Sequence, residues 1–363
     1  MRCKCKNCNN TIFSDEIDWR NPQCPYCNQP PSPEWSGRVI NGFQIIGELG
    51  RGNNGIVFWA CEVWRERPVA LKILEGERAA DKSYVERFMA EAKAAARLSH
   101  PNIIKAIDAG LSNDGVYYFA MELVDGPTIE EKIESGGALP LNETLRIATR
   151  IAFALEYAWS SQQLTHGDIK PGNIIMDPNG EPKLADLGLA KFGNETNQEC
   201  EELSATPMYA PPEVILWQFD KIGMLSDIYS FGATLYEMFS GTAPFAGRSV
   251  EDVLQAQLKE NPPELKTILT GFDPEISDFV AAMMSKKCED RPESHLQVAT
   301  FMSSKLIYDK ELPPGSEELE ITVDTGTPSK GSKKFFSNKI SKSIIYLAAG
   351  ALLGIIFLYF WFR

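Results

Sequence analysis

Residues 166–173 read His-Gly-Asp-Ile-Lys-Pro-Gly-Asn, and this stretch decides how the rest of the chain is interpreted. It supplies an acid, a base and an amide within a few positions. The proline near its end fixes φ and the following glycine leaves φ free, so we predict an irregular loop of defined shape rather than a helix. Two short apolar runs separated by a turn signal follow, and the second ends at Asp186. A pair of short strands there would hold Asp168, Asn173 and Asp186 close together.

This loop matches the needs of one kind of chemistry. A carboxylate that accepts a proton, with an amide and a second carboxylate that hold Mg²⁺, is what phosphoryl transfer requires. Asp, Asn and Gly are also common in turns, so the loop alone leaves ordinary turn chemistry open. Other parts of the chain must decide between the two interpretations.

Length and composition are those of a globular protein with appendages. The chain has 363 residues, 44% of them hydrophobic and 23% charged, so it can bury a sizeable core. A formal net charge of −13 argues against nonspecific nucleic-acid binding by the chain as a whole. The N-terminus lacks the apolar core of a signal peptide, so we expect the main body in the cytoplasm.

Cysteines are concentrated at the N-terminus. Five of the eight lie in the first 27 residues, which indicates a local metal site in a reducing compartment rather than a disulfide framework. Residues 1–30 resemble a zinc ribbon, whose folding the metal would have to support. The four proposed ligands have the spacing Cys5-x2-Cys8-x15-Cys24-x2-Cys27. A redox dithiol or unpaired cysteines in a tail are the alternatives, and Cys3 competes with Cys5 as a ligand.

Three patterns follow a proline-rich linker predicted at 31–42. Residues 50–57 read Gly-Arg-Gly-Asn-Asn-Gly-Ile-Val between two strand-like runs, which favours a phosphate-covering hairpin over a dinucleotide fold. Lys72 interrupts an apolar strand, where a buried ammonium needs a partner. A helical period over 81–98 brings Glu91 close to its apolar face, within reach of Lys72. A snorkelling lysine and a solvated glutamate are the alternatives.

Together these residues resemble the eukaryotic-like protein kinase family, specifically its bacterial serine/threonine branch. The resemblance implies an α+β, two-lobed fold with a small β-rich N-lobe (43–121), a hinge (122–126) and a large helical C-lobe (127–309). It rests on motifs in the family's order: the glycine-rich loop 50–57, Lys72, Glu91, the loop 166–173, Asp186-Leu187-Gly188, Pro211-Pro212-Glu213, Asp227 and Arg291.

The resemblance implies a role for each matching residue. Asp168 would accept or orient the proton of the substrate hydroxyl, and Lys170 would neutralise charge on the transferred phosphate. Asn173 and Asp186 would coordinate Mg²⁺. The loop form Asp-x-Lys-Pro-x-Asn implies Ser and Thr hydroxyls of proteins as acceptors. Asp227 would tie down the catalytic loop, and Glu213 and Arg291 would form a scaffold ion pair.

The same resemblance implies an ATP site beneath the N-lobe. Lys72, held by Glu91, would pair with the α- and β-phosphates. Met121 would be the gatekeeper beside the adenine, which would meet the Glu122 and Val124 backbones. The glycine-rich loop would cover the phosphates through Gly50, Gly52, Gly55 and Val57.

The chain departs from the family pattern in its catalytic loop. The usual His-Arg-Asp is His-Gly-Asp, so the arginine that reads a phosphorylated activation loop is absent. We therefore predict activation that does not depend on loop phosphorylation. Changes at Leu187 and Pro211 remove no catalytic group. Thr206 resembles the family's threonine near the acceptor site, and whether Ser204 or Thr206 is phosphorylated stays open.

The C-terminal part predicts a membrane anchor. Residues 310–342 have the composition of a disordered juxtamembrane linker, and 343–362 are predicted as a transmembrane helix. Residues 344–362 carry no charge and as a helix would span about 29 Å, close to the hydrocarbon thickness of a bilayer; a buried core helix is the alternative. Preceding lysines predict a single-pass cell-membrane protein with its kinase domain in the cytoplasm.

Gly350-x3-Gly354 suggests helix pairing and thus a homodimer.

The leading hypothesis is a membrane-anchored serine/threonine kinase that uses ATP and Mg²⁺, acts on protein substrates and carries a structural Zn²⁺. A pseudokinase signalling scaffold is the first alternative. The second is a zinc-dependent nucleic-acid-binding regulator. Its only support is the presence of Arg2, Lys4 and Lys6 around the cysteines.

Overall fold

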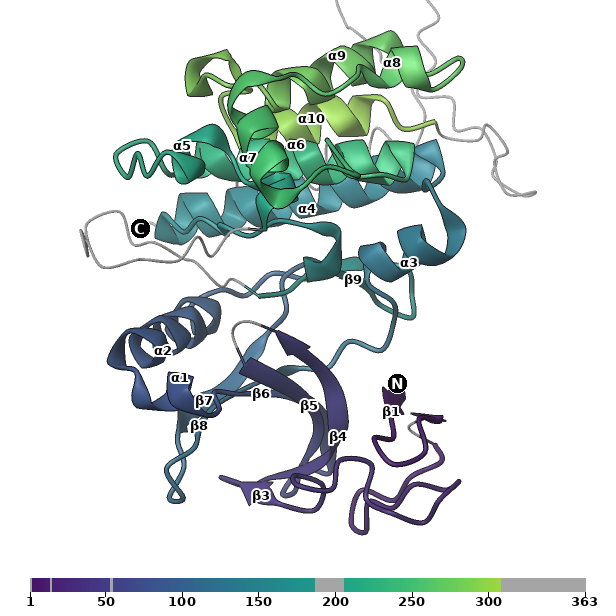
Figure 1. The fold of residues 1–363 in the computed structure, drawn as a ribbon, viewed down its shortest axis with the longest axis vertical. Coiled ribbons are helices and arrows are strands. Elements are labelled where there is room, and N and C mark those ends of the chain that lie inside the picture. Colours follow the sequence, from purple (N-terminus) through teal and green to yellow (C-terminus); the bar gives the residue numbers. More distant parts are fainter. Residues whose placement is uncertain (1, 14, 53–54, 187–205, 308–363) are drawn as a thin grey trace, which may run out of the picture. The chain divides into compact units, whose positions relative to one another are not determined.

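The computed structural model describes residues 2–13, 15–52, 55–186 and 206–307 (Figure 1). The predicted juxtamembrane linker and membrane helix, and the activation-segment residues 187–205 with Leu187, Gly188 and Ser204, lie outside these ranges. No helix within the described ranges combines the length and the apolar character needed to cross a bilayer.

The N-lobe is built on an antiparallel sheet with the strand order β3-β4-β5-β6-β8-β7. Side chains alternate across it, as the pleat requires: Val69 and Leu71 enter one apolar cluster, while Ala70 enters the cluster beneath α2. The strands are β3 (Val39–Ile40), β4 (Phe43–Gly52), β5 (Gly55–Glu62), β6 (Arg67–Ile73), β7 (Ala106–Leu111) and β8 (Tyr117–Glu122).

One long helix, α2 (Lys82–Ala96), covers the second face of this sheet after the short α1 (Glu77–Ala80) (Figure 1). It begins where Asp81 accepts a hydrogen bond from the backbone N–H of Ser83, a common N-cap arrangement. Phe88 and Ala92 are buried with the sheet residues, as the periodicity predicted. Glu91 on the same helix is buried as well.

The predicted linker at 31–42 is partly folded into the N-lobe, which differs from the expectation. Trp35 is buried with its ring centroid 5.3 Å from that of Phe58. Val39 and Ile40 form β3, which pairs with the start of β4. The prolines of this segment do favour an extended linker, but burial of a tryptophan and an isoleucine stabilises a docked conformation instead.

The C-lobe consists mainly of helices that pack around α4 and α6 (Figure 1). α6 is buried on nearly every face, which its predominantly apolar sequence permits. The helices are α3 (Ile129–Gly136), α4 (Leu141–Gln162), α5 (Pro212–Ile215), α6 (Met224–Ser240), α7 (Val250–Lys259), α8 (Leu265–Ile268), α9 (Pro274–Met283) and α10 (His295–Ser304). Three 3₁₀ turns are η1 (Pro171–Asn173), η2 (Pro207–Tyr209) and η3 (Cys288–Asp290).

Two short strands follow the catalytic loop, as the sequence predicted. β9 (Ile174–Met176) pairs antiparallel with β10 (Pro182–Leu184). Asp177 closes the turn between them by accepting hydrogen bonds from the N–H groups of Asn179 and Glu181. This hairpin fixes the chain between Asn173 and Asp186.

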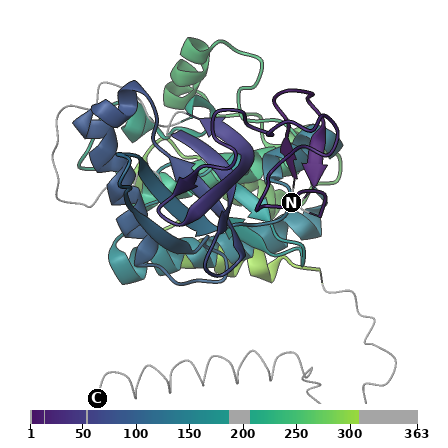
Figure 2. The same cartoon turned by 90° about the horizontal axis from the view of Figure 1, so that it is seen from below.

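The N-terminal segment forms a small hairpin of β1 (Arg2–Lys4) and β2 (Thr11–Phe13). It lies beside β4 in both ribbon views (Figures 1 and 2). Ile12 and Ile17 are buried there with Ile46 and Trp59 of the N-lobe sheet. The segment therefore shares a core with the sheet.

Candidate active site and cysteine cluster

The glycine-rich loop connects β4 and β5, as its flanks predicted. Gly50 pairs with Val57, and Gly52 pairs with Gly55, which closes the hairpin. Gly55 has φ of 122°, and a Cβ there would lie 2.4 Å from the backbone oxygen of Ile73. Only glycine fits this position, because any side chain would collide with the neighbouring strand β6.

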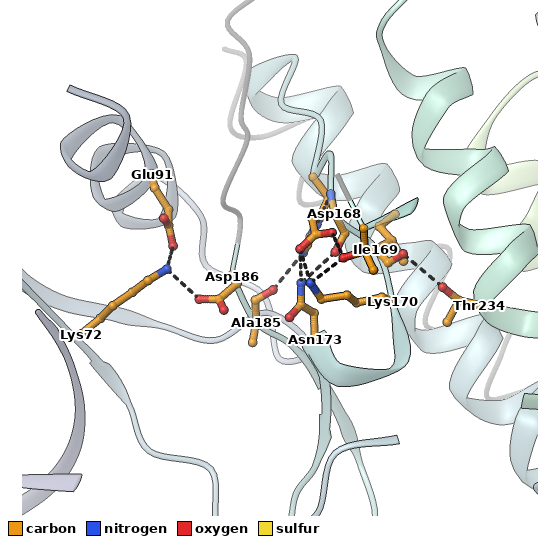
Figure 3. Close-up of polar contacts among 11 residues, drawn as sticks. Lys72, Glu91, Asp168, Ile169, Lys170, Asn173, Ala185, Asp186 and Thr234 are labelled. Atoms are coloured by element: carbon orange, nitrogen blue, oxygen red, sulfur yellow. Dashed lines mark hydrogen bonds and ion pairs between the residues drawn. The ribbon is translucent and has the colours of Figure 1, made fainter. Parts of the chain in front are cut away.

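Lys72 on β6 is held between two carboxylates. Its Nζ lies 2.8 Å from Oε1 of Glu91 and 3.1 Å from Oδ1 of Asp186 (Figure 3). Burial alone would lower the pKa of Lys72, but the attraction of Asp186 and Glu91 outweighs it and raises the pKa, so the ammonium is charged. The structure thus joins three residues that are far apart in the sequence.

The catalytic loop brings its acid, base and amide together, as predicted. The ammonium of Lys170 donates to Oδ2 of Asp168 over 2.7 Å (Figure 3). The amide nitrogen of Asn173 donates to the backbone oxygen of Asp168 at 2.8 Å and to Oδ2 at 3.2 Å. Because the amide nitrogen is used in this way, the amide oxygen of Asn173 is left for a metal ion.

Buried contacts hold this loop from the C-lobe. The backbone N–H groups of His166 and Gly167 donate to the two carboxylate oxygens of Asp227 on α6, over 2.7 and 2.8 Å. The hydroxyl of Thr234, about two helical turns further along α6, donates to the backbone oxygen of Ile169 (Figure 3). Asp227 therefore ties the loop to α6, as the resemblance implied.

Thr206 joins the site, although it is not among the predicted site residues. Its hydroxyl accepts from Nζ of Lys170 at 2.9 Å and donates to Oδ1 of Asp168 at 3.2 Å. It lies immediately before η2, where Pro207 begins a turn. The sequence signal was the resemblance of Thr206 to the family's threonine near the acceptor site, which does not by itself reveal a contact with Asp168.

The predicted hinge follows β8. Met121 is buried near the end of that strand, and the N–H of Glu122 donates to the backbone oxygen of Lys105. Of its two backbone groups, Glu122 therefore has only the carbonyl to offer a ligand. Within the described ranges no backbone acceptor takes the N–H of Val124. This donor and acceptor are the groups that the resemblance assigns to adenine.

Glu213 and Arg291 form the predicted scaffold pair. The guanidinium donates through both terminal nitrogens to both carboxylate oxygens, over 2.7 and 2.8 Å. Burial works against the charge of Glu213, but hydrogen bonding and attraction from Arg291 lower its pKa overall. The pair joins α5 to the segment after η3.

The four predicted zinc ligands converge on one point. The Sγ atoms of Cys5, Cys8, Cys24 and Cys27 all lie within 4.8 Å of one another. Sγ of Cys5 is 3.6 Å from that of Cys27, and Cys8 and Cys24 are also separated by 3.6 Å. Cys3 is outside this group and is buried against Gly47, so the geometry favours Cys5 over Cys3 as the ligand.

Comparison with known proteins agrees with this arrangement. The family described as "Protein kinase domain" matches residues 43–302. Serine/threonine-protein kinase PrkC of Bacillus subtilis is 28% identical over 356 residues, which cover 88% of this chain and 54% of that protein. Serine/threonine-protein kinase pkn3 of Myxococcus xanthus is 30% identical over 294 residues, covering 78% and 53%. The chain thus spans about half the length of both relatives.

Solved structures give the same fold. The crystal structure of the Mycobacterium tuberculosis PknI kinase domain superposes with a TM-score of 0.60 at 26% identity. The match covers 74% of this chain and 98% of that one. It includes both lobes, a β-rich N-lobe and a helical C-lobe.

Proposed function

The chain belongs to the protein kinase family, and from this premise we propose that it transfers the γ-phosphate of ATP to serine and threonine hydroxyls of proteins. One observation carries the proposal. Asp168 lies in hydrogen-bond contact with both Lys170 and Thr206, while Lys72 is fixed between Glu91 and Asp186. A carboxylate that can accept a proton and a cation that can bind phosphate support phosphoryl transfer as the function.

Each residue has a defined part in the reaction. The carboxylate of Asp168 takes the proton of the acceptor hydroxyl as its oxygen attacks the γ-phosphorus and ADP departs. The ammonium of Lys170 stabilises negative charge on the transferred group, and Lys72 binds the phosphates that remain with ADP. Asn173 and Asp186 would hold Mg²⁺, which when bound neutralises phosphate charge.

The test is phosphate transfer from radiolabelled ATP by the purified chain, with its own hydroxyls and a general protein substrate as acceptors. Asp168→Asn should reduce labelling at least a hundredfold, since it removes the proton acceptor. Asp114→Asn, on an exposed turn far along the N-lobe, is the matched control and should label like wild type. Equal labelling by Asp168→Asn, or none by wild type, would favour the pseudokinase scaffold instead.

We also propose that the enzyme works without activation-loop phosphorylation. Gly167 stands where the family has an arginine that binds the loop phosphate, so this cation is missing. Phosphatase treatment should therefore leave the initial rate of transfer to an added substrate unchanged. A large loss of rate after dephosphorylation, restored by incubation with ATP, contradicts the proposal.

A structural Zn²⁺ in the cysteine cluster is the third part of the proposal. A tetrahedral site with Zn–S bonds of about 2.3 Å separates its sulfur atoms by about 3.8 Å. The Sγ separations of 3.6 Å in two pairs fit this size. Elemental analysis of the purified chain should find zinc, and protein without any bound metal would refute this part.

Residues 344–362 support a further proposal, a single membrane-spanning helix that keeps the kinase domain in the cytoplasm. They are uncharged and follow a lysine-rich segment. Pairing through Gly350 and Gly354 would give a homodimer. Full-length protein should sediment with membranes and need detergent for release. Recovery in the supernatant without detergent would disprove the anchor.

A further inference from the structure

The N-terminal segment belongs to an apolar cluster that packs against two residues next to the predicted nucleotide site. Its apolar cluster, formed with Ile46, Trp59 and Cys61, is also packed against Leu49 and Leu123. Leu49 directly precedes the glycine-rich loop, and Leu123 is in the hinge. Both leucines also pack against the cluster between the sheet and α2. The cysteine segment therefore shares an apolar cluster with the residue before the glycine-rich loop and with a hinge residue.

A chain of ion pairs connects the same two regions. Lys6 lies in the turn between Cys5 and Cys8, and its Nζ is 2.5 Å from Oε2 of Glu48 on β4. The same carboxylate oxygen is 3.3 Å from the guanidinium of Arg51, which belongs to the glycine-rich loop. Only 13% of the Glu48 side chain is exposed, so solvent screens these pairs incompletely.

β4 is shaped to receive the segment. A Cβ on Gly47 would lie 2.8 Å from Sγ of Cys3, so a larger residue there would force the side chain of Cys3 to move. The pairing of β4 with β5 shifts register between Ile45 and Gly47, and again between Glu48 and Gly50. Irregularities of this kind change the direction in which the side chains of a strand point. Here they occur where the cysteine segment docks and just before the loop begins.

We propose that the metal-loaded cysteine cluster positions the glycine-rich loop for nucleotide through Lys6 and Glu48. The inference rests on the zinc site proposed above. The turn that carries Lys6 is held by Cys5 and Cys8, whose arrangement depends on their shared metal. Loss of metal releases Lys6, leaves Glu48 with Arg51 alone, and loosens β4 ahead of Gly50. The cysteine cluster thereby controls nucleotide affinity, and Lys6 and Glu48 are positioning residues.

The experiment measures binding of Mg-ADP to detergent-purified full-length protein by calorimetric titration, with zinc content determined on the same samples. Lys6→Met should keep its zinc and bind Mg-ADP about two- to fivefold more weakly, the range for a partly exposed ion pair. Lys6→Arg keeps the cation and should bind like wild type. Lys4→Met is the matched control, because Lys4 is exposed on the same segment and makes no ion pair with the described residues.

Removal of the metal is the second arm. Cys8→Ser should lose zinc and bind Mg-ADP at least as weakly as Lys6→Met. A Lys6→Met protein that keeps both its zinc and wild-type affinity overturns the coupling and leaves the zinc site intact. Wild-type protein without metal overturns the metal dependence itself. Binding rather than transfer is measured, so a chain without kinase activity still gives an answer.

Discussion

The backbone N–H of Gly167 donates to Oδ1 of Asp227 over 2.8 Å, and Gly167 holds this position with φ of 77°. Side chains other than glycine are strained at such φ values. Gly167 stands where the family has an arginine. As a glycine, it adopts this φ without strain directly before Asp168. Glycine at this position thus suits the backbone conformation that attaches the catalytic loop to Asp227.

Gly167→Ala and Gly167→Arg should each lower the free energy of unfolding by about 1 kcal/mol, because a Cβ is unfavourable at this φ. Urea denaturation measures the change. Gly115→Ala is the matched control: Gly115 has the same φ of 77°, and a Cβ there meets open space. The Gly115→Ala protein should lose about as much stability as Gly167→Ala and keep the transfer activity of wild type. A Gly167→Ala protein as stable as wild type would argue against strain at this position.

Thr206→Val should reduce kcat about tenfold to a hundredfold, since the hydroxyl bridges Lys170 and Asp168 and its loss leaves both partly unpaired. Thr206→Ser keeps the hydroxyl and should retain most of the rate. Steady-state kinetics with a fixed protein substrate measures both. Equal rates for the valine and serine variants would mean that the hydroxyl is not used.

Arg291→Met should destabilise the C-lobe by about 3–5 kcal/mol, because it leaves the Glu213 carboxylate buried without its partner. The guanidinium is 0% exposed and the carboxylate only 2%. The double variant Arg291→Met with Glu213→Met removes both charges and should lose less stability than the single variant. Denaturation curves compare the stability of the single and double variants. A double variant that is less stable than Arg291→Met contradicts the prediction.

His295 predicts an acid-dependent loss of stability. Burial lowers its pKa to about 3, and neither ring nitrogen has a hydrogen-bond partner among the described residues. Unfolded histidine titrates near pH ~6.5, so below that pH the unfolded chain binds a proton that the folded chain does not. The folded state should lose about 1.4 kcal/mol between neutral pH and pH ~5.5, and more as pH falls toward 3.

Replacement of this histidine tests the prediction. His295→Leu cannot take up a proton, so its free energy of unfolding should change less between pH ~7.5 and ~5.5 than that of wild type, by about 1.4 kcal/mol. Parallel slopes for the two proteins would assign the acid sensitivity to other groups.

The cysteine variants should differ in metal content. Cys5→Ser removes one of four converging sulfur atoms and should lose zinc, with a lower melting temperature. Cys3→Ser should keep its zinc, because Cys3 is buried against Gly47 outside the cluster. Elemental analysis decides. The reverse pattern would assign the fourth ligand to Cys3.

The sequence by itself determined the fold family and most of the candidate site. Its motifs are short and local: a loop such as 166–173 carries its acid, base and amide in fixed order, so their proximity follows from the backbone. The β9–β10 hairpin was predictable for the same reason, since a turn signal separates two short apolar runs. The cysteine spacing likewise brings together two pairs of thiols.

Some contacts join segments that are far apart in the sequence, and only the tertiary structure shows them. The hydroxyl of Thr206 reaches Asp168 from 38 positions away, and nothing in the intervening sequence requires it. Likewise, residues 31–42 carry linker-like prolines, yet Trp35 docks on Phe58 because burial outweighs that local preference. The pairing of Lys6 with Glu48 depends on how the cysteine segment packs on β4. Packing of separate surfaces is a property of the whole fold, and no short stretch of sequence contains it.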